Sequence, residues 1–147
     1  MRRSLAWPIV IFVLLACGAC GGGNQTSASS CVGPYLDDQP RVGGHFGAPA
    51  PTVHPGDVIT VYGHWYTITC NDTGQHDPLQ PLPAVNLTLT LPSGDTKPLG
   101  KYSPAGPDMG FTASVHIPAT APAGIATVSD NRTETRPATF PFRIATG

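Results

Sequence analysis

The feature that most constrains the fold of this chain is its high content of glycine and proline, which occur 17 times each in 147 residues. Both residues interrupt helices, glycine through its conformational freedom and proline through its missing N–H. Between these breaks, apolar and polar residues alternate with a period of two, and no segment keeps a helical period over three turns. The pattern therefore predicts an all-β fold.

The clearest alternation predicts a strand in which Val85, Leu87, Leu89 and Leu91 share one face. Pro141 falls inside the last alternating segment, and because proline cannot donate to a ladder, that segment is expected to be an edge strand. Further strands are expected at 52–53, 59–64, 111–117, 126–128 and 140–144.

Strands at this spacing predict an Ig-like β-sandwich of about seven strands. A Trp between two suitably spaced core cysteines, as in antibody domains, is absent from the sequence. Inward-facing residues of both sheets would form the core, namely Ile59, Val61, Leu87, Leu89, Phe111, Val115, Phe140 and Phe142.

The N-terminus predicts export. Met1-Arg2-Arg3 is basic, and 5–16 is an apolar run too short for a membrane span. The run ends in Leu-Leu-Ala followed by Cys17, which resembles a bacterial lipobox, where the chain is cut before a cysteine that is then lipidated. We therefore expect a lipoprotein signal peptide at 1–16, a lipidated Cys17 with a flexible tether at 17–30, and one domain at 31–147.

The remaining cysteines fit an oxidising compartment. Cys31 and Cys70 both lie in the expected domain, and pairing them in a disulfide is the simplest arrangement. Cys20 is left over in the tether, where it is an alternative lipidation site. Cys17 and Cys20 also form a CxxC pair, but redox pairs of that kind open a helix in a βαβ unit, and this one ends a signal sequence.

Three segments share a pattern of turns and strands: PGDVITVYG at 55–63, GFTASVHIP at 110–118 and PAG at 122–124. Together they resemble the Ig-like modules of secreted actinobacterial lipoproteins. The resemblance covers about 50–145 and implies an exported β-sandwich, a module that serves as spacer, binder or enzyme appendage. The insertion at 67–83 and the segment at 31–47 depart from the minimal module.

Charge excludes one class of partner. The formal net charge is −1 and only 12% of residues are charged. A nucleic-acid-binding protein needs a basic patch or stripe, which this sequence lacks, so nucleic acid is not an expected partner. No cofactor is expected either.

Five histidines raise the alternative of an envelope copper or zinc protein. They lack a His-x-His or HExxH spacing, and His64 and His116 are predicted to point outward from strands, so solvated surface histidines are the simpler interpretation. Oxygen donors in 70–77 leave calcium open, although their spacing differs from an EF-hand. The five candidates are His45, His54, His64, His76 and His116.

An aromatic cluster is the one candidate binding patch. Tyr62, Trp65 and Tyr66 lie close together in sequence, and a disulfide from Cys31 to Cys70 would bring Tyr35 near them. Clustered exposed aromatic residues favour recognition of protein or sugar. The alternative is that Trp65 packs on the disulfide or covers the core. The residues following Tyr35, at 36–38, would complete a surface pocket.

Catalysis has little support in the sequence. A GxSxG motif is absent, and Asp37 and Asp38 are adjacent, so in a strand they would point apart. We expect a non-catalytic interaction or structural protein, held to the extracytoplasmic side of the cell membrane by lipid. Its expected partner is an envelope protein or glycan, bound through an edge strand or loops.

Overall fold

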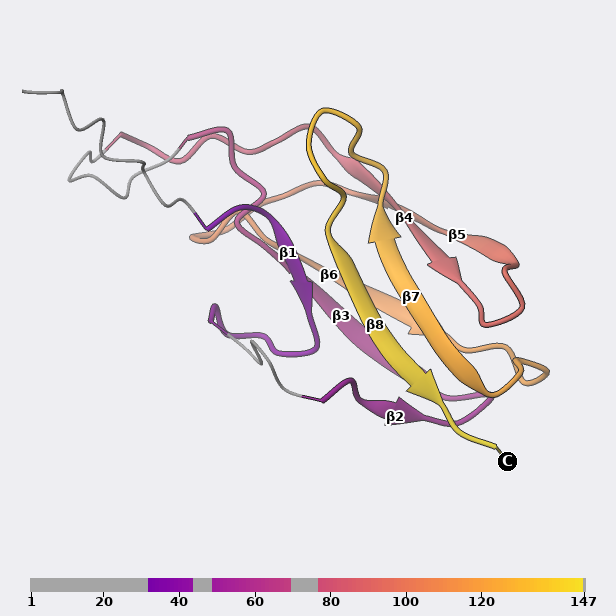
Figure 1. Cartoon of the computed structure of the whole chain (residues 1–147). Coiled ribbons are helices and arrows are strands. Elements are labelled where there is room, and N and C mark those ends of the chain that lie inside the picture. The colour runs from indigo at the N-terminus through magenta and orange to yellow at the C-terminus, as the bar shows by residue number, and fades with distance from the viewer. Residues whose placement is uncertain (1–31, 44–48, 70–76, 147) are drawn as a thin grey trace, which may run out of the picture.

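Over the residues that the structure describes, the protein is an all-β sandwich of eight strands (Figure 1). The structure is a computed structural model that describes residues 32–43, 49–69 and 77–146. No helix within these ranges is long and apolar enough to cross a bilayer. The strands are β1 (Tyr35–Asp37), β2 (Thr52–Val53), β3 (Val58–His64), β4 (Val85–Thr90), β5 (Thr96–Tyr102), β6 (Phe111–His116), β7 (Gly124–Asp130) and β8 (Thr139–Ile144).

The strands form two sheets, which confirms the predicted β-sandwich, with eight strands in the described residues where about seven were expected. One sheet has the order β1-β3-β6 and the other the order β2-β8-β7-β4-β5. All pairs are antiparallel except β2 with β8. Counted from β2, the second and fifth strands, β3 and β6, share one sheet, and the third, sixth and seventh, β4, β7 and β8, share the other, as in Ig domains. Two strands went unpredicted, β1 and β5.

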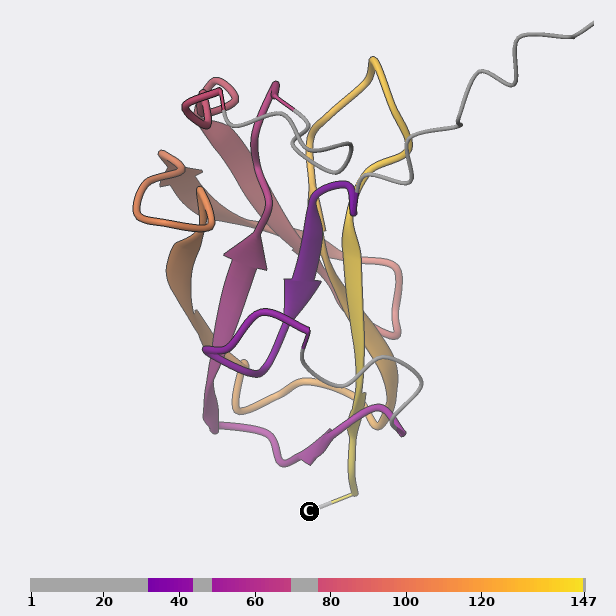
Figure 2. The same ribbon diagram turned by 90° about the vertical axis from the view of Figure 1, so that its left-hand side faces the viewer.

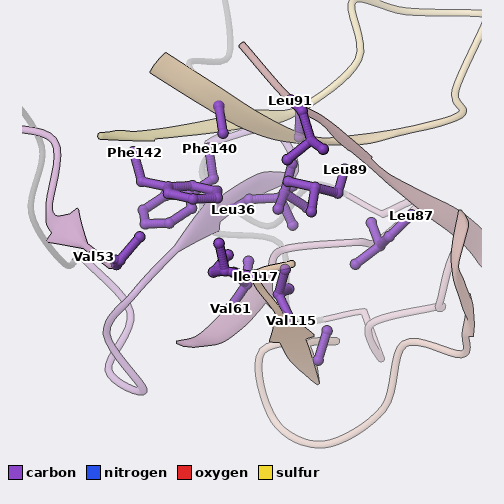
Figure 3. Packing of buried hydrophobic residues seen from close by; sticks show 14 of the residues in the cluster. Leu36, Val53, Val61, Leu87, Leu89, Leu91, Val115, Ile117, Phe140 and Phe142 are labelled. Carbon is purple, nitrogen blue, oxygen red and sulfur yellow. The ribbon is translucent and has the colours of Figure 1, made fainter. Parts of the chain in front are cut away.

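The core lies between the two sheets (Figure 3). Six of the eight predicted core residues are buried, whereas Ile59 and Phe111 are half-buried and pack against the cluster. Alternation explains the result, because successive side chains of a strand point to opposite faces. The six are Val61, Leu87, Leu89, Val115, Phe140 and Phe142.

The prediction that the last strand is an edge strand is wrong, because β2 pairs beside it. The β2 pairing reaches only Arg143 and Ile144, so Pro141 lies beyond its reach. Arg143 donates its N–H to the Pro51 carbonyl on the β2 side. By alternation the nitrogen of Pro141 faces the same side, so proline costs the β7–β8 ladder no hydrogen bond.

At the end of β3, the alternation of inward and outward side chains shifts by one residue. Trp65 has a left-handed backbone with φ 57°, and its N–H bonds to the Asp108 carbonyl at 2.8 Å. Inward positions of β3 are odd-numbered up to Gly63, but after Trp65 the buried residue is Tyr66, with 0% exposure. The irregular residue therefore turns Tyr66 into the sandwich, where strict alternation would have pointed it outward.

The predicted lipidation site and disulfide lie outside the described residues. Cys17, Cys20, Cys31 and Cys70 all fall there, so both assignments stay predictions. Among the described residues, Tyr35 is the ladder partner of His64, so the chain entering β1 runs beside the chain leaving β3.

Candidate functional site

Two connections meet at one end of the sandwich, opposite the C-terminal end of β8 (Figures 1 and 2). The first is the long β3–β4 connection, and the second is the loop 131–138 between β7 and β8.

The β7–β8 loop is held by a buried carboxylate at the end of β7. The side chain of Asp130 has 0% exposure. Its Oδ2 accepts hydrogen bonds from Arg132 Nε at 2.7 Å and from the Tyr66 hydroxyl at 2.9 Å. Its Oδ1 accepts the backbone N–H groups of Arg132 at 3.3 Å and Ala138 at 3.2 Å. One carboxylate thus ties both ends of the loop to the core.

Arg132 completes this network. Its guanidinium lies 5.3 Å from the centre of the Tyr66 ring, within the range of a cation–π contact. The two terminal nitrogens donate to Thr135 Oγ1 and to the Arg136 carbonyl, each at 3.3 Å. The charge of Arg132 is therefore satisfied inside the protein.

Tyr66 connects this network to the core. Its ring packs on Phe111 with the centroids 4.8 Å apart. Burial, and after it the charge of Asp130 and the hydrogen bond to it, raise the pKa of the Tyr66 phenol far above its ordinary value of 10.0. The phenol is thus held protonated as a hydrogen-bond donor.

The β3–β4 connection is closed by its own hydrogen bonds. Ile68 donates its N–H to the Gln80 carbonyl, and Leu82 donates its N–H to the Tyr66 carbonyl, both at 2.8 Å. Thr67 Oγ1 also donates to the Gln80 carbonyl at 2.8 Å. The two arms of the connection, 66–69 and 80–82, therefore lie side by side.

An open cleft of about 500 Å³ lies between the two connections. Polar residues of the β7–β8 loop, 131–135, form one wall. Ile68 is the most exposed large apolar side chain of the described residues, at 65%. The remaining lining is mainly apolar: Pro34, Ile68, Leu82, Pro83, Ala84 and Val85, with Thr67.

The cleft offers apolar contact area with a few placed polar groups. Clefts of this size with apolar walls and a few placed polar groups are typical of binding sites. The buried Asp130 and the half-buried Arg132, which lies in the wall itself, are engaged with each other and with the loop backbone. Their visible role is to fix the shape of the cleft.

The predicted aromatic patch is divided by the fold. Tyr66 is fully buried, so its predicted place on an exposed patch is wrong, and the shift in alternation at Trp65 is the reason. Trp65 itself is half-buried. Tyr35 and Tyr62 are half-buried on the outer face of the three-stranded sheet, on either side of His64, with ring centroids 5.0 and 6.4 Å from it.

The neighbours of Tyr35 do not form the expected surface pocket. Leu36 pairs with Gly63 and enters the core, and Asp37 is also buried. Asp38 is half-buried, and its N–H bonds to Asp37 Oδ1 at 2.7 Å.

The prediction that His64 is solvated is wrong, because the side chain is buried at 2% exposure. It does project from the outer face, but neighbouring segments cover it. Its Nδ1 lies 2.6 Å from Asp108 Oδ2, and its Nε2 lies 3.0 Å from the Gln39 carbonyl. The ring thus joins β3 to the turn before β6 and to the segment after β1.

The other described histidines lie apart from His64. His54 is exposed beside Asp57, and His116 is exposed on β6 at the opposite end of the β3–β6 ladder from His64. His45 and His76 lie outside the described residues. Within the described ranges no three His, Cys, Asp or Glu side chains gather as a metal site would require.

Sequence reasoning missed Asp130 and Arg132. A weak signal exists, because Asp130 continues the inward series of Ala126 and Val128, and a carboxylate at an inward position needs a partner. The long-range partner, Tyr66, could not be found in this way. Comparison with protein-family models, with curated proteins and with solved structures finds no match to this chain.

Proposed function

We propose that this protein is a lipid-anchored, exported cell-envelope module that binds a partner non-catalytically through the cleft between its β3–β4 and β7–β8 connections. The basic start, the short apolar run and the lipobox-like sequence before Cys17 support export and lipidation. Tethering by lipid would keep the domain on the extracytoplasmic side of the cell membrane.

The observation that carries the proposal is the fixed shape of an open apolar cleft. Its polar wall is tied to the core through Asp130, and its other wall is closed by hydrogen bonds to Gln80. A preformed site loses little conformational entropy on binding, which leaves more of the interaction energy as affinity.

The lining favours one kind of partner. Aliphatic and proline side chains face the cleft, and aromatic rings are absent from its lining among the residues described. Sugars are commonly bound by stacking on such rings, whereas an apolar protein segment needs none. We therefore favour an apolar segment of an envelope protein over a glycan.

Site-specific photo-crosslinking in intact cells tests this function. A photoreactive amino acid at Thr133, which is exposed in the wall of the cleft, is expected to give an adduct of discrete mass. The same group at Ile125, which is exposed on the outer face of β7, is the matched control and is expected to give none.

A second substitution shows whether the adduct depends on the cleft. Ile68→Asp changes an exposed side chain, so the fold should be kept, and the Thr133 adduct should fall by about tenfold or more, since burying an unpaired carboxylate opposes binding. Equal adducts from Thr133 and Ile125, or an adduct that Ile68→Asp leaves unchanged, would refute recognition at the cleft.

A further inference from the structure

The edge of β6 differs from the other sheet edges of the described structure in carrying no protection against strand pairing. Edge strands usually avoid such pairing by charge, proline, bulges or shortness. β5 has Lys97, Pro98 and Lys101, with a register shift opposite Leu87/Thr88. β2 has two residues and β1 has three. β6 is a regular strand of six residues, FTASVH, with no Lys, Arg, Asp, Glu or Pro.

Backbone hydrogen bonds show which groups of β6 face outward from the sheet. Ile117 donates its N–H to the Asp57 carbonyl at 2.8 Å and accepts the Gly56 N–H at 3.1 Å, so its backbone groups face the β3 side. Alternate residues of a strand direct these groups to opposite sides. The N–H and C=O groups of Thr112, Ser114 and His116 therefore point away from β3.

This open edge has defined ends. Gly110 exchanges two 2.8 Å backbone hydrogen bonds with Ala105, so the preceding turn occupies the edge at that position. Pro118 ends the strand at the other side. Within the described residues no strand pairs with β6 beyond β3, and β6 forms the left-hand margin of the sheet in Figure 2. The open segment is thus 112–116, with Ser114 at its centre.

We propose that β6 pairs antiparallel with β6 of a second copy of this chain, about a two-fold axis at Ser114. In that register Ser114 faces Ser114 of the second copy, and Thr112 faces His116. Each of these residues has outward backbone groups, so every such pair can exchange two N–H···O=C bonds. The two three-stranded sheets would become one continuous sheet.

The side chains favour a second copy over another extended partner. Thr112, Ser114 and His116 are all exposed on the outer face. The two-fold register pairs Ser with Ser and Thr with His, so no like charges face each other. It also keeps outward residues opposite outward residues, which a shift of one position would not. The open segment is used along its full length.

A charge at the two-fold axis tests this pairing. Ser114→Lys would place two lysines opposite each other, whereas Thr60→Lys, at the ladder partner of Ser114 on the central strand β3, adds the same exposed charge away from the new interface. Sedimentation equilibrium of the full chain carrying Cys17→Ala, which avoids lipid-driven association, should show a dimer. Ser114→Lys should weaken it by about tenfold or more, and Thr60→Lys should leave it unchanged.

Mixing variants of opposite charge completes the test. Ser114→Glu alone should also dissociate the dimer, and an equimolar mixture with Ser114→Lys should restore it, because unlike charges then meet at the axis. A chain that stays monomeric at all concentrations, or equal effects of Ser114→Lys and Thr60→Lys, would overturn the proposal. The result does not depend on the cleft, which is probed separately at Thr133 and Ile68.

Discussion

At the scale of single residues, Tyr66 links the core to the β7–β8 loop, a role that the aromatic residues around it in the sequence do not indicate. Its ring packs on Phe111 in the core, while its hydroxyl donates to Asp130 beneath the cleft. One side chain therefore couples the packing of the sandwich to the shape of the proposed binding end.

The raised pKa of Tyr66 predicts alkaline sensitivity. Below pH 10 the phenol is protonated in both states, and its stabilising effect is fully present. As pH rises above the ordinary value of 10.0, the unfolded chain ionises this tyrosine while the folded chain cannot. The free energy of unfolding should therefore fall with pH, by about 1.4 kcal/mol per unit from this group.

Tyr66→Phe isolates that effect. The variant loses the hydrogen bond to Asp130 and should be less stable at neutral pH by about 1–3 kcal/mol. Above pH 10 its stability, measured by urea unfolding between pH 8 and about 11.5, should fall less steeply than that of the parent chain. Parallel curves for the two proteins would contradict the assignment.

At the scale of elements, the β7–β8 loop depends on one carboxylate. Asp130→Asn keeps the size of the side chain but cannot accept all four hydrogen bonds, and it leaves the partly buried Arg132 guanidinium without its counter-charge. We expect a loss of about 3–5 kcal/mol in the free energy of unfolding. Glu134→Gln removes an exposed carboxylate from the same loop and should change it by less than about 0.5 kcal/mol. Similar effects of the two substitutions would be evidence against the network.

The strands that carry a regular alternation could be predicted from the sequence, and two others could not. β5 has the sequence Thr-Lys-Pro-Leu-Gly-Lys-Tyr, in which Pro98, Gly100 and two lysines interrupt the alternation of apolar and polar residues. Most of this edge strand is exposed to solvent, so its residues need not follow the pattern that burial in the core imposes. β1 has only three residues. β1 is fixed by pairing with β3, a strand distant in the chain, which no local pattern reports, whereas β5 pairs with β4, the strand directly before it.

The cleft was not predicted from the sequence, and none of the four residues of the predicted aromatic patch lines it. The cleft borders the aromatic segment at 62–66, yet Tyr66 contributes from beneath it and Trp65 does not line it. The left-handed conformation of Trp65 decides this, and a tryptophan gives no sequence signal for positive φ. Likewise, alternation placed His64 on the correct face, but only the tertiary contacts to Asp108 and Gln39 bury it.

At the scale of the whole molecule, the proposed anchor makes a simple prediction. Cys17→Ala should move the protein from the membrane fraction to the soluble exported fraction, because lipidation at that residue would be lost. Cys20→Ala is the matched control and should leave the protein in the membrane fraction. If the two variants fractionate in the reverse manner, the lipid is on Cys20.

The position of Pro34 shows that the chain enters the sandwich at the end that carries the cleft. Pro34 lines the cleft and directly precedes β1, whereas β8 ends at the opposite end of the sandwich (Figure 1). A membrane anchor at Cys17, as proposed, would therefore join the domain at the end that carries the cleft. Under the proposed anchoring and binding, the cleft would face the bilayer and would meet molecules embedded in or lying on that membrane before any that approach from farther away.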